Sequence, residues 1–302
     1  MKVASSVKGE SGFVVNMTQI STGQSGVGSL HGNQIVNAER QLRGEYVNAD
    51  GEVYLNDGDD TATLGNQGGW ARGGSGNDII AAGDGDHNLY GGDGDDTLSG
   101  GGGNDQLYTG NGNDTLSGDA GDDILVINGS GTSTLIGGAG NDTVRQDLTN
   151  YTPMGDVNFV VEMNLAEGFS GGKGYTELRE TLVTIENIDY KGPLSSELTG
   201  DDQDNIISGG SGTDIIIGGA GNDTLDGGSG TNALSGGVGD DTYKYAYDGI
   251  TTITDTSGLD HLFLTTRDVS GKSYWGDGGY YDGNDLIIST SNSSENKLTI
   301  KD

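Results

Sequence analysis

The chain has 302 residues, of which 59 are Gly, 2 are Pro and none is Cys, and its formal net charge is −32 at pH 7. So negative a charge disfavours binding to nucleic acid or to an anionic membrane, and the lack of Cys excludes a disulfide-held fold. Only 31% of the residues are hydrophobic, so something other than a large core must offset the conformational entropy of the chain.

The first 54 residues carry short β-like segments between Gly and Asn turns (SGFVVNMTQI, GEYVNADGEVYL). Residues 46–54 are in phase with the repeats that follow and place Val53 at an inward position. We therefore expect an N-terminal β region that caps the next segment, or else the tail of a larger upstream domain. The N-terminus has no apolar core of the secretory type, so no cleavable signal peptide is expected.

From Leu55 onward the sequence divides into units of nine residues, for example GGSGNDIIA at 73–81 and GGDGDDTLS at 91–99. A first array of ten units covers residues 55–145, with Ile127 as a single inserted residue, and a second array of five covers 200–244. The pattern is G-G-x-G-x-D-x-U-x, where U is a large apolar residue. Gly at positions 1, 2 and 4 permits positive φ and close backbone approach.

This pattern resembles the RTX (repeats-in-toxin) family of bacterial proteins, whose nonapeptides form calcium-binding β-rolls. The resemblance implies an all-β fold, a right-handed parallel β-roll (β-solenoid) with flanking β capping regions. In each unit the eighth residue is expected to face inward. With two units per coil, the core becomes a ladder of single side chains: Ile80, Leu89, Leu98, Leu107, Leu116, Leu125, Leu135, Val144, Ile207, Ile216, Leu225, Leu234 and Tyr243.

The sixth residue of each unit is the candidate metal ligand. With two units per coil, sixth residues 18 positions apart stack, and stacked carboxylates repel unless a cation lies between them. Ca²⁺ suits such a gap because it takes 6–8 oxygen ligands in flexible geometry. The ladders contain Asp60, Asp78, Asp96 and Asp114; Asp105, Asp123 and Asp142; and, in the second array, Asp214, Asp223 and Asp241.

The family resemblance implies that backbone carbonyls complete each site, from positions 2 and 4 of one unit and positions 1 and 3 of the next but one. One site would then hold Gly74, Gly76, Asp78, Gly91, Asp93 and Asp96, and the next Gly92, Gly94, Asp96, Thr109, Asn111 and Asp114. Across the roll the set is Gly101, Gly103, Asp105, Gly118, Ala120 and Asp123, and in the second array it is Gly219, Gly221, Asp223, Gly236, Val238 and Asp241.

Several units depart from the pattern at position 6, where Gly69, His87, Ser133, Asn205 and Asn232 stand. We expect no ion where Gly69 or His87 is needed. Asn ligates through its amide oxygen, so Asn205 with Asp223, and Asp214 with Asn232, are expected to form weaker sites. We therefore expect the whole chain to bind about six to nine Ca²⁺ ions. The three histidines, His31, His87 and His261, are interpreted as surface polar residues.

Two further segments lack the repeat. Residues 146–199 include strand-like DVNFVVEMNL and TLVTIENI, and we expect them to pack beside the roll; an independent ligand domain is the alternative. Residues 245–302 alternate as strands do and resemble the C-terminal flanking region of RTX proteins. Aromatic residues gather around this segment and suggest cap packing or a sugar-stacking platform: Tyr243, Tyr245, Tyr247, Tyr274, Trp275, Tyr280 and Tyr281.

No catalytic or cofactor-binding residues are assigned, and we expect the chain not to be an enzyme. H-E-x-x-H is missing from the sequence, and the single G-x-S-x-G match, around Ser170, is interpreted as chance in so Gly-rich a chain.

The resemblance implies a secreted or cell-surface protein that leaves the cell unfolded through type I secretion machinery and folds on external calcium. We favour a structural and secretion module of a large bacterial surface adhesin. The alternatives are the C-terminal targeting or folding module of a secreted enzyme (polysaccharide-modifying or protease) and an RTX toxin. Calcium is the expected partner, with an extracellular carbohydrate or cell-surface ligand also considered; we expect no nucleic acid, no membrane insertion and a monomer.

Overall fold

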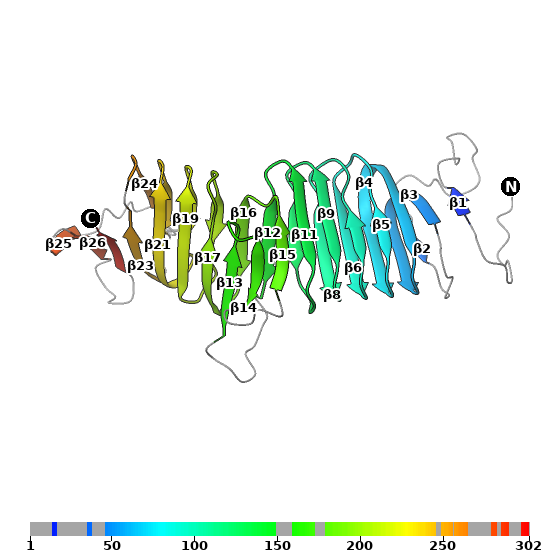
Figure 1. Ribbon diagram of the computed structural model, residues 1–302, viewed down its shortest axis with the longest axis horizontal. Coiled ribbons are helices and arrows are strands. Elements are labelled where there is room, and N and C mark those ends of the chain that lie inside the picture. The colour runs from blue at the N-terminus through cyan, green and yellow to red at the C-terminus, as the bar shows by residue number, and fades with distance from the viewer. Residues whose placement is uncertain are drawn as a thin grey trace, which may run out of the picture. The chain divides into compact units, whose positions relative to one another are not determined.

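The computed structural model describes residues 14–16, 35–37, 46–148, 159–172, 179–245, 249–255, 257–264, 279–282, 285–289 and 297–301. The chain forms two compact units, Met1–Asp142 and Thr143–Asp302. All regular structure in the described ranges is β-strand, and within each unit Figure 1 shows the strands standing side by side. No helix in these ranges is long and apolar enough to span a membrane.

The first unit is a parallel β-solenoid whose strands pair with the strand one full coil away. Its strands are β1 (Val14–Asn16), β2 (Ile35–Asn37), β3 (Tyr46–Asp57), β4 (Thr61–Ser75), β5 (Ile79–Ala81), β6 (His87–Asp93), β7 (Thr97–Ser99), β8 (Gln106–Asn111), β9 (Thr115–Ala120), β10 (Ile124–Ile127) and β11 (Thr134–Ala139). Strands β4, β6, β8 and β10 form one parallel sheet edge to edge, and β5, β7, β9 and β11 form the other.

The pairing register confirms that two nonapeptides make one coil. Leu89 pairs with Leu107, and Leu107 with Leu125, each 18 residues on. The inserted Ile127 lengthens one step, so that Leu116 pairs with Leu135. All thirteen side chains expected to face inward are buried, with at most 2% of their surface exposed. Each such side chain packs against the inward side chains of the coils before and after it, because a single nonapeptide has no other apolar face.

The second unit is also built on parallel pairs. Its strands are β12 (Thr143–Asp147), β13 (Val160–Asn164), β14 (Phe169–Gly172), β15 (Arg179–Val183), β16 (Asn187–Lys191), β17 (Ser195–Thr199), β18 (Ile206–Ser208), β19 (Asp214–Ala220), β20 (Thr224–Asp226), β21 (Gly230–Val238), β22 (Thr242–Tyr245), β23 (Gly249–Thr254), β24 (His261–Leu264), β25 (Gly279–Asp282), β26 (Asp285–Ser289) and β27 (Lys297–Lys301).

The residues between the two arrays form part of this second solenoid. Strand β16 pairs in parallel with β18, and β17 with β19, so Ile188 and Leu198 continue the core ladder of the repeats. Strand β13 also belongs to the solenoid, because it pairs in parallel with β17. Antiparallel pairs join β13 to β14 and β14 to β15. Strands β23 and β24 likewise continue from β21 and β22, so the solenoid runs past the last recognisable repeat.

Candidate metal centre

The sixth residues of the repeats stack as the register predicts. In most coils the backbone N–H of the sixth residue donates a hydrogen bond to the carboxylate Oδ1 of the sixth residue one coil on; Asp114 donates instead to the hydroxyl of Ser133, at 3.0 Å. The Oδ1 atoms of Asp78, Asp96 and Asp114 accept the amides of Asp60, Asp78 and Asp96 at 2.8–2.9 Å. The same bond joins Asp105 to Asp123, Asp123 to Asp142, and Asp223 to Asp241. In each of these pairs, one carboxylate oxygen therefore accepts a hydrogen bond from the backbone of the preceding coil.

The second oxygen of most ladder carboxylates has no hydrogen-bond partner, although it is fully enclosed. This holds for Oδ2 of Asp60, Asp78, Asp96, Asp105, Asp123, Asp214, Asp223 and Asp241, and each of these residues is at most 4% exposed. A buried charged oxygen without a partner costs several times the free energy of an ordinary lost hydrogen bond. Eight repetitions of one unpartnered anionic oxygen indicate that these positions are built to bind a positively charged ligand.

The surroundings of the ladder carboxylates disfavour their charged form. Burial, together with the charges of Asp78 and Asp114, raises the pKa of Asp96 to about 7. Burial and neighbouring charges likewise raise the pKa of Asp123 to about 7 and that of Asp78 to about 6. Since burial in low dielectric disfavours the charged form, a bound cation would restore ordinary carboxylates.

The glycines at position 1 shape the space beside each unpartnered oxygen. A Cβ placed on Gly91 would lie 2.4 Å from Asp96 Oδ2 and 2.6 Å from the carbonyl oxygen of Thr109 in the next coil. A Cβ on Gly118 would lie 2.2 Å from Asp123 Oδ2. A carboxylate oxygen and a carbonyl oxygen thus converge on a place that only glycine leaves open.

The carbonyls implied by the family resemblance also meet in the gap between coils. The carbonyl oxygens of Gly74 and Gly76 point at the next coil, where they would lie 2.1 Å from a Cβ on Gly92 and on Gly94. The carbonyl of Asp93 points back and accepts the amide of Gly76 at 2.7 Å. The set Gly219, Gly221, Gly236 and Val238 repeats this geometry in the second array. In the first array the carbonyls of Gly103 and Gly118 do the same, whereas the carbonyl of Gly101 accepts the amide of Ala120 at 2.9 Å.

The donor set fits calcium. The ligand atoms at the regular aspartate sites are carboxylate and carbonyl oxygens, which hard cations prefer, and the phenol oxygen of Tyr243 also lies 2.5 Å from a Cβ placed on Gly236. Thiolate is excluded because the chain has no Cys. Residues that would hold each ion are therefore the sixth-position aspartates of two adjacent coils, together with the carbonyls of positions 1 to 4 around them.

Two asparagines occupy ladder positions differently. Asn205 turns its Oδ1 toward Gly200, where a Cβ would lie 2.2 Å from it, but this oxygen already accepts the amide of Asp201 at 2.8 Å, unlike the unpartnered Oδ2 of the aspartates. Asn232 uses Oδ1 to accept the amide of Asp214 at 3.2 Å and turns Nδ2 toward Gly227. In this orientation Asn232 offers an N–H donor to the gap, which weakens the case for an ion beside it.

The interpretation of His87 as a surface residue is wrong. His87 is 1% exposed, because its place in the register turns position 6 inward whatever the residue type. Its Nε2 lies 2.9 Å from the carbonyl oxygen of Gly65 and its Nδ1 lies 3.4 Å from Asp105 Oδ1. Burial lowers the pKa of His87, but the interactions with Asp105 and Gly65 outweigh it, so the pKa is raised overall. The imidazole thus fills the gap. His261 is exposed as expected, and His31 lies outside the described residues.

Other expectations fall partly outside the described chain. Tyr243 and Tyr245 are buried, while Tyr247, Tyr274 and Trp275 are among the residues that the structure does not describe. A different aromatic row stands on the first unit, where the rings of Tyr90 and Tyr108 stack with centroids 4.3 Å apart. Ser170 of the G-x-S-x-G match is buried in β14.

Sequence reasoning missed two ladder members. Ser196 donates its amide and its hydroxyl to Asp214 Oδ1, at 3.0 and 2.7 Å, and Asp260 accepts the amide of Asp241 at 3.0 Å. Neither belongs to a recognisable nonapeptide. A weak signal was present for Asp260, since Gly258, Asp260 and Leu262 keep the spacing of positions 4, 6 and 8.

Comparison with known families agrees with this geometry. A family model described as the RTX calcium-binding nonapeptide repeat (4 copies) matches residues 64–98, 90–125, 127–145, 197–225 and 208–243. No curated protein matches the chain.

Proposed function

Both arrays of this chain are RTX calcium-binding nonapeptide repeats that form a parallel β-solenoid, and we propose that calcium binding drives their folding. The observation that carries the proposal is the unpartnered, enclosed Oδ2 at eight ladder aspartates. When binding requires the folded arrangement, the free energy of binding becomes free energy of folding.

The two carboxylate oxygens of each ladder aspartate have different roles. The Oδ1 atoms set the spacing of adjacent coils through amide hydrogen bonds, while the Oδ2 atoms and the carbonyls present the coordinating oxygens. Bound calcium supplies the positive charge that the ladders lack. Residues 55–145 contain fifteen Asp and no Glu, against Arg72 and Arg145 as the two basic residues. Since few apolar side chains are available to offset this repulsion, the arrays without calcium are expected to be disordered.

A calcium titration followed by circular dichroism tests the proposal. The β-sheet signal is expected to rise over the millimolar range of Ca²⁺ and to stay low at equal Mg²⁺, because Mg²⁺ demands stricter octahedral geometry and retains its waters. Native mass spectrometry of the same samples counts the ions, about six to nine at saturation. A chain that is fully folded in excess chelator would refute ion-coupled folding.

We further propose that the solenoid works outside the cell, as a monomeric structural and secretion module of a large surface adhesin exported by type I machinery. The calcium-coupled folding proposed above supports this use, since arrays that fold on calcium would stay unfolded where calcium is low and fold where it is high. A targeting module of a secreted enzyme and a toxin repeat domain are the alternatives, and a carbohydrate or cell-surface ligand is the partner class that fits an adhesin.

The coding sequence around the chain distinguishes these uses. Tandem immunoglobulin-like repeats would favour the adhesin, a catalytic domain the enzyme, and an amphipathic helical region the toxin. We also propose that the chain itself is not an enzyme; turnover of any polysaccharide or peptide substrate by the purified chain would contradict this.

A further inference from the structure

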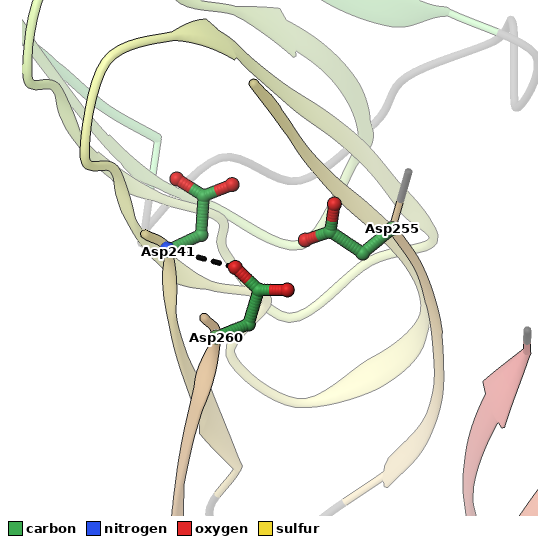
Figure 2. Close-up of side chains that lie close together, drawn as sticks. All are labelled: Asp241, Asp255 and Asp260. Carbon is green, nitrogen blue, oxygen red and sulfur yellow. Dashed lines mark hydrogen bonds between the residues drawn. The ribbon is translucent and has the colours of Figure 1, made fainter. Parts of the chain in front are cut away.

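Three carboxylates meet at the end of the second array, beyond the last nonapeptide. Figure 2 shows Asp241, Asp255 and Asp260 with their carboxylate groups turned toward one another. One carboxylate oxygen from each lies within 4.8 Å of the other two. Asp241 also donates its backbone N–H to Asp260 Oδ1 at 3.0 Å. The family match ends at residue 243, so two of these three residues lie outside the known repeats.

The chain reaches this arrangement through a coil that keeps the repeat register without its sequence. Strand β24 pairs in parallel with β22, which brings Leu262 beside Tyr243, and Ser257 pairs with Val238. Gly258 has a φ of 128°, and a Cβ on it would lie 1.7 Å from the carbonyl oxygen of Gly239. These are the geometric marks of position 4 in the repeats.

Counting from Gly258 places Asp260 at position 6 and Asp255 at position 1. A repeat normally has glycine at position 1 and contributes only its carbonyl there. Here a carboxylate stands at that place, and it also accepts a hydrogen bond from the hydroxyl of Tyr243. The last gap of the array is therefore flanked by three carboxylates, whereas the gaps between regular repeats have two.

Asp241 supplies independent reason to expect a ligand in this gap. It is fully buried, its Oδ1 accepts the amide of Asp223 at 2.8 Å, and its Oδ2 has no hydrogen-bond partner. The carbonyl of Gly237 faces the same coil, where it accepts the Ser257 hydroxyl at 3.1 Å. An enclosed anionic oxygen beside two further carboxylates and backbone carbonyls offers oxygens alone, as a hard divalent cation requires.

We propose that Asp241, Asp255 and Asp260 bind one further Ca²⁺, which joins the non-repeat coil 255–263 to the last nonapeptide. This inference depends on the proposed function, because the site forms only when the array folds with calcium. With three carboxylates it carries more negative charge than the regular sites, and calcium affinity rises with ligand charge. It is therefore expected to fill at lower calcium than the repeat sites.

Ion counting on the full chain tests this site. Asp255→Asn keeps an oxygen acceptor for Tyr243 and removes one ligand charge, and Asp202→Asn makes the same charge change on an exposed side chain of the second array. At saturating calcium, native mass spectrometry should find the parent's ion count in Asp255→Asn, where Asp241 and Asp260 still flank the gap, and in Asp202→Asn. Asp255→Asn combined with Asp260→Asn leaves one carboxylate there and should bind one ion fewer than the parent.

Circular dichroism at saturating calcium verifies that each variant keeps its solenoid, and a calcium titration on the same samples gives a second readout. The tightest binding step of the parent should be missing from Asp255→Asn, even if that variant loses some β-sheet signal. A full ion count in the double variant, or an unchanged first binding step in Asp255→Asn, would overturn the site while leaving the repeat sites standing. A parent chain that binds no calcium would overturn both the site and the proposed function.

Discussion

Asp96 allows the two oxygens of a ladder carboxylate to be tested separately. Its Oδ1 accepts the amide of Asp78 at 2.8 Å, whereas its Oδ2 is enclosed without a partner. Asn at this position keeps an acceptor for the amide and removes the charge, while Ala removes both. We predict that, without calcium, Asp96→Asn stabilises the folded state and Asp96→Ala does so far less. With calcium, both variants should be less stable than the parent.

The magnitudes follow from the carboxylate's surroundings. The pKa of Asp96 rises from 3.8 to about 7, and one pKa unit corresponds to about 1.4 kcal/mol, so the charged form is disfavoured by on the order of 4 kcal/mol when no ion is bound. Asp96→Asn recovers up to this amount above pH 7. Asp96→Ala leaves the buried amide of Asp78 without an acceptor, which costs about 1–3 kcal/mol and cancels much of the gain.

Folding in chelator at about pH 8, driven by increasing sucrose, provides the assay, because excluded osmolytes favour the compact state. The sucrose midpoint of the β-sheet signal should fall clearly for Asp96→Asn and little for Asp96→Ala, and it should not change for the exposed control Asp57→Asn. In calcium, ion counting should show two ions lost from Asp96→Ala, because the residue faces a coil on each side. Asp96→Asn, whose amide oxygen can still ligate, should bind those two ions more weakly. Equal sucrose midpoints for the two Asp96 variants would refute the separate roles of Oδ1 and Oδ2.

Three further predictions use the same measurements. In chelator, acidification from about pH 8 to about pH 5 should increase the β-sheet signal, because the folded-state pKa of the ladder aspartates is raised to about 6 or 7 from 3.8. The stability is then full below the unfolded pKa and is lost as the pH rises through the folded pKa; a signal that falls on acidification would contradict this. Gly91→Ala should abolish one ion, since its Cβ would lie 2.4 Å from Asp96 Oδ2, whereas Gly102→Ala, whose nearest contact is 3.5 Å, should keep every ion. His87→Asp should gain one ion beside Asp105, and an unchanged count would show that the imidazole is not what closes that gap.

Much of the fold follows from the period of nine, because position within the repeat outweighs residue type. The apolar eighth position is buried from Ile80 to Tyr243, and even the slip caused by Ile127 appears as one 19-residue step. The same rule explains the error over His87. A lone histidine in a charged, Gly-rich sequence suggests the surface, but position 6 faces the gap between coils, and the ring is buried there.

The non-repeat coils were harder to predict, because backbone register alone defines them. Strands β16 and β17 continue the solenoid with Ile188 and Leu198 inward, although Gly192 is the one glycine that marks their turns at positions 1, 2 or 4. Asp260 likewise takes a ladder position through backbone pairing: β24 pairs with β22, which places Asp260 one coil after Asp241. A sequence pattern built on side chains does not detect a coil whose turns use other residues.

The glycines of the repeat serve two purposes, and only one of them is conformational. Gly92 and Gly94 have φ of 121° and 132°, a region that other residues rarely adopt. Asp119 nonetheless stands at position 2 with φ of 72°, so a short polar side chain can meet that backbone demand. Gly91, at position 1, does not adopt positive φ, contrary to the sequence expectation, yet a Cβ there would overlap the ligand oxygen of Asp96. Position 1 is therefore kept open for the ion, and its substitution should reduce calcium binding even where the backbone accommodates alanine.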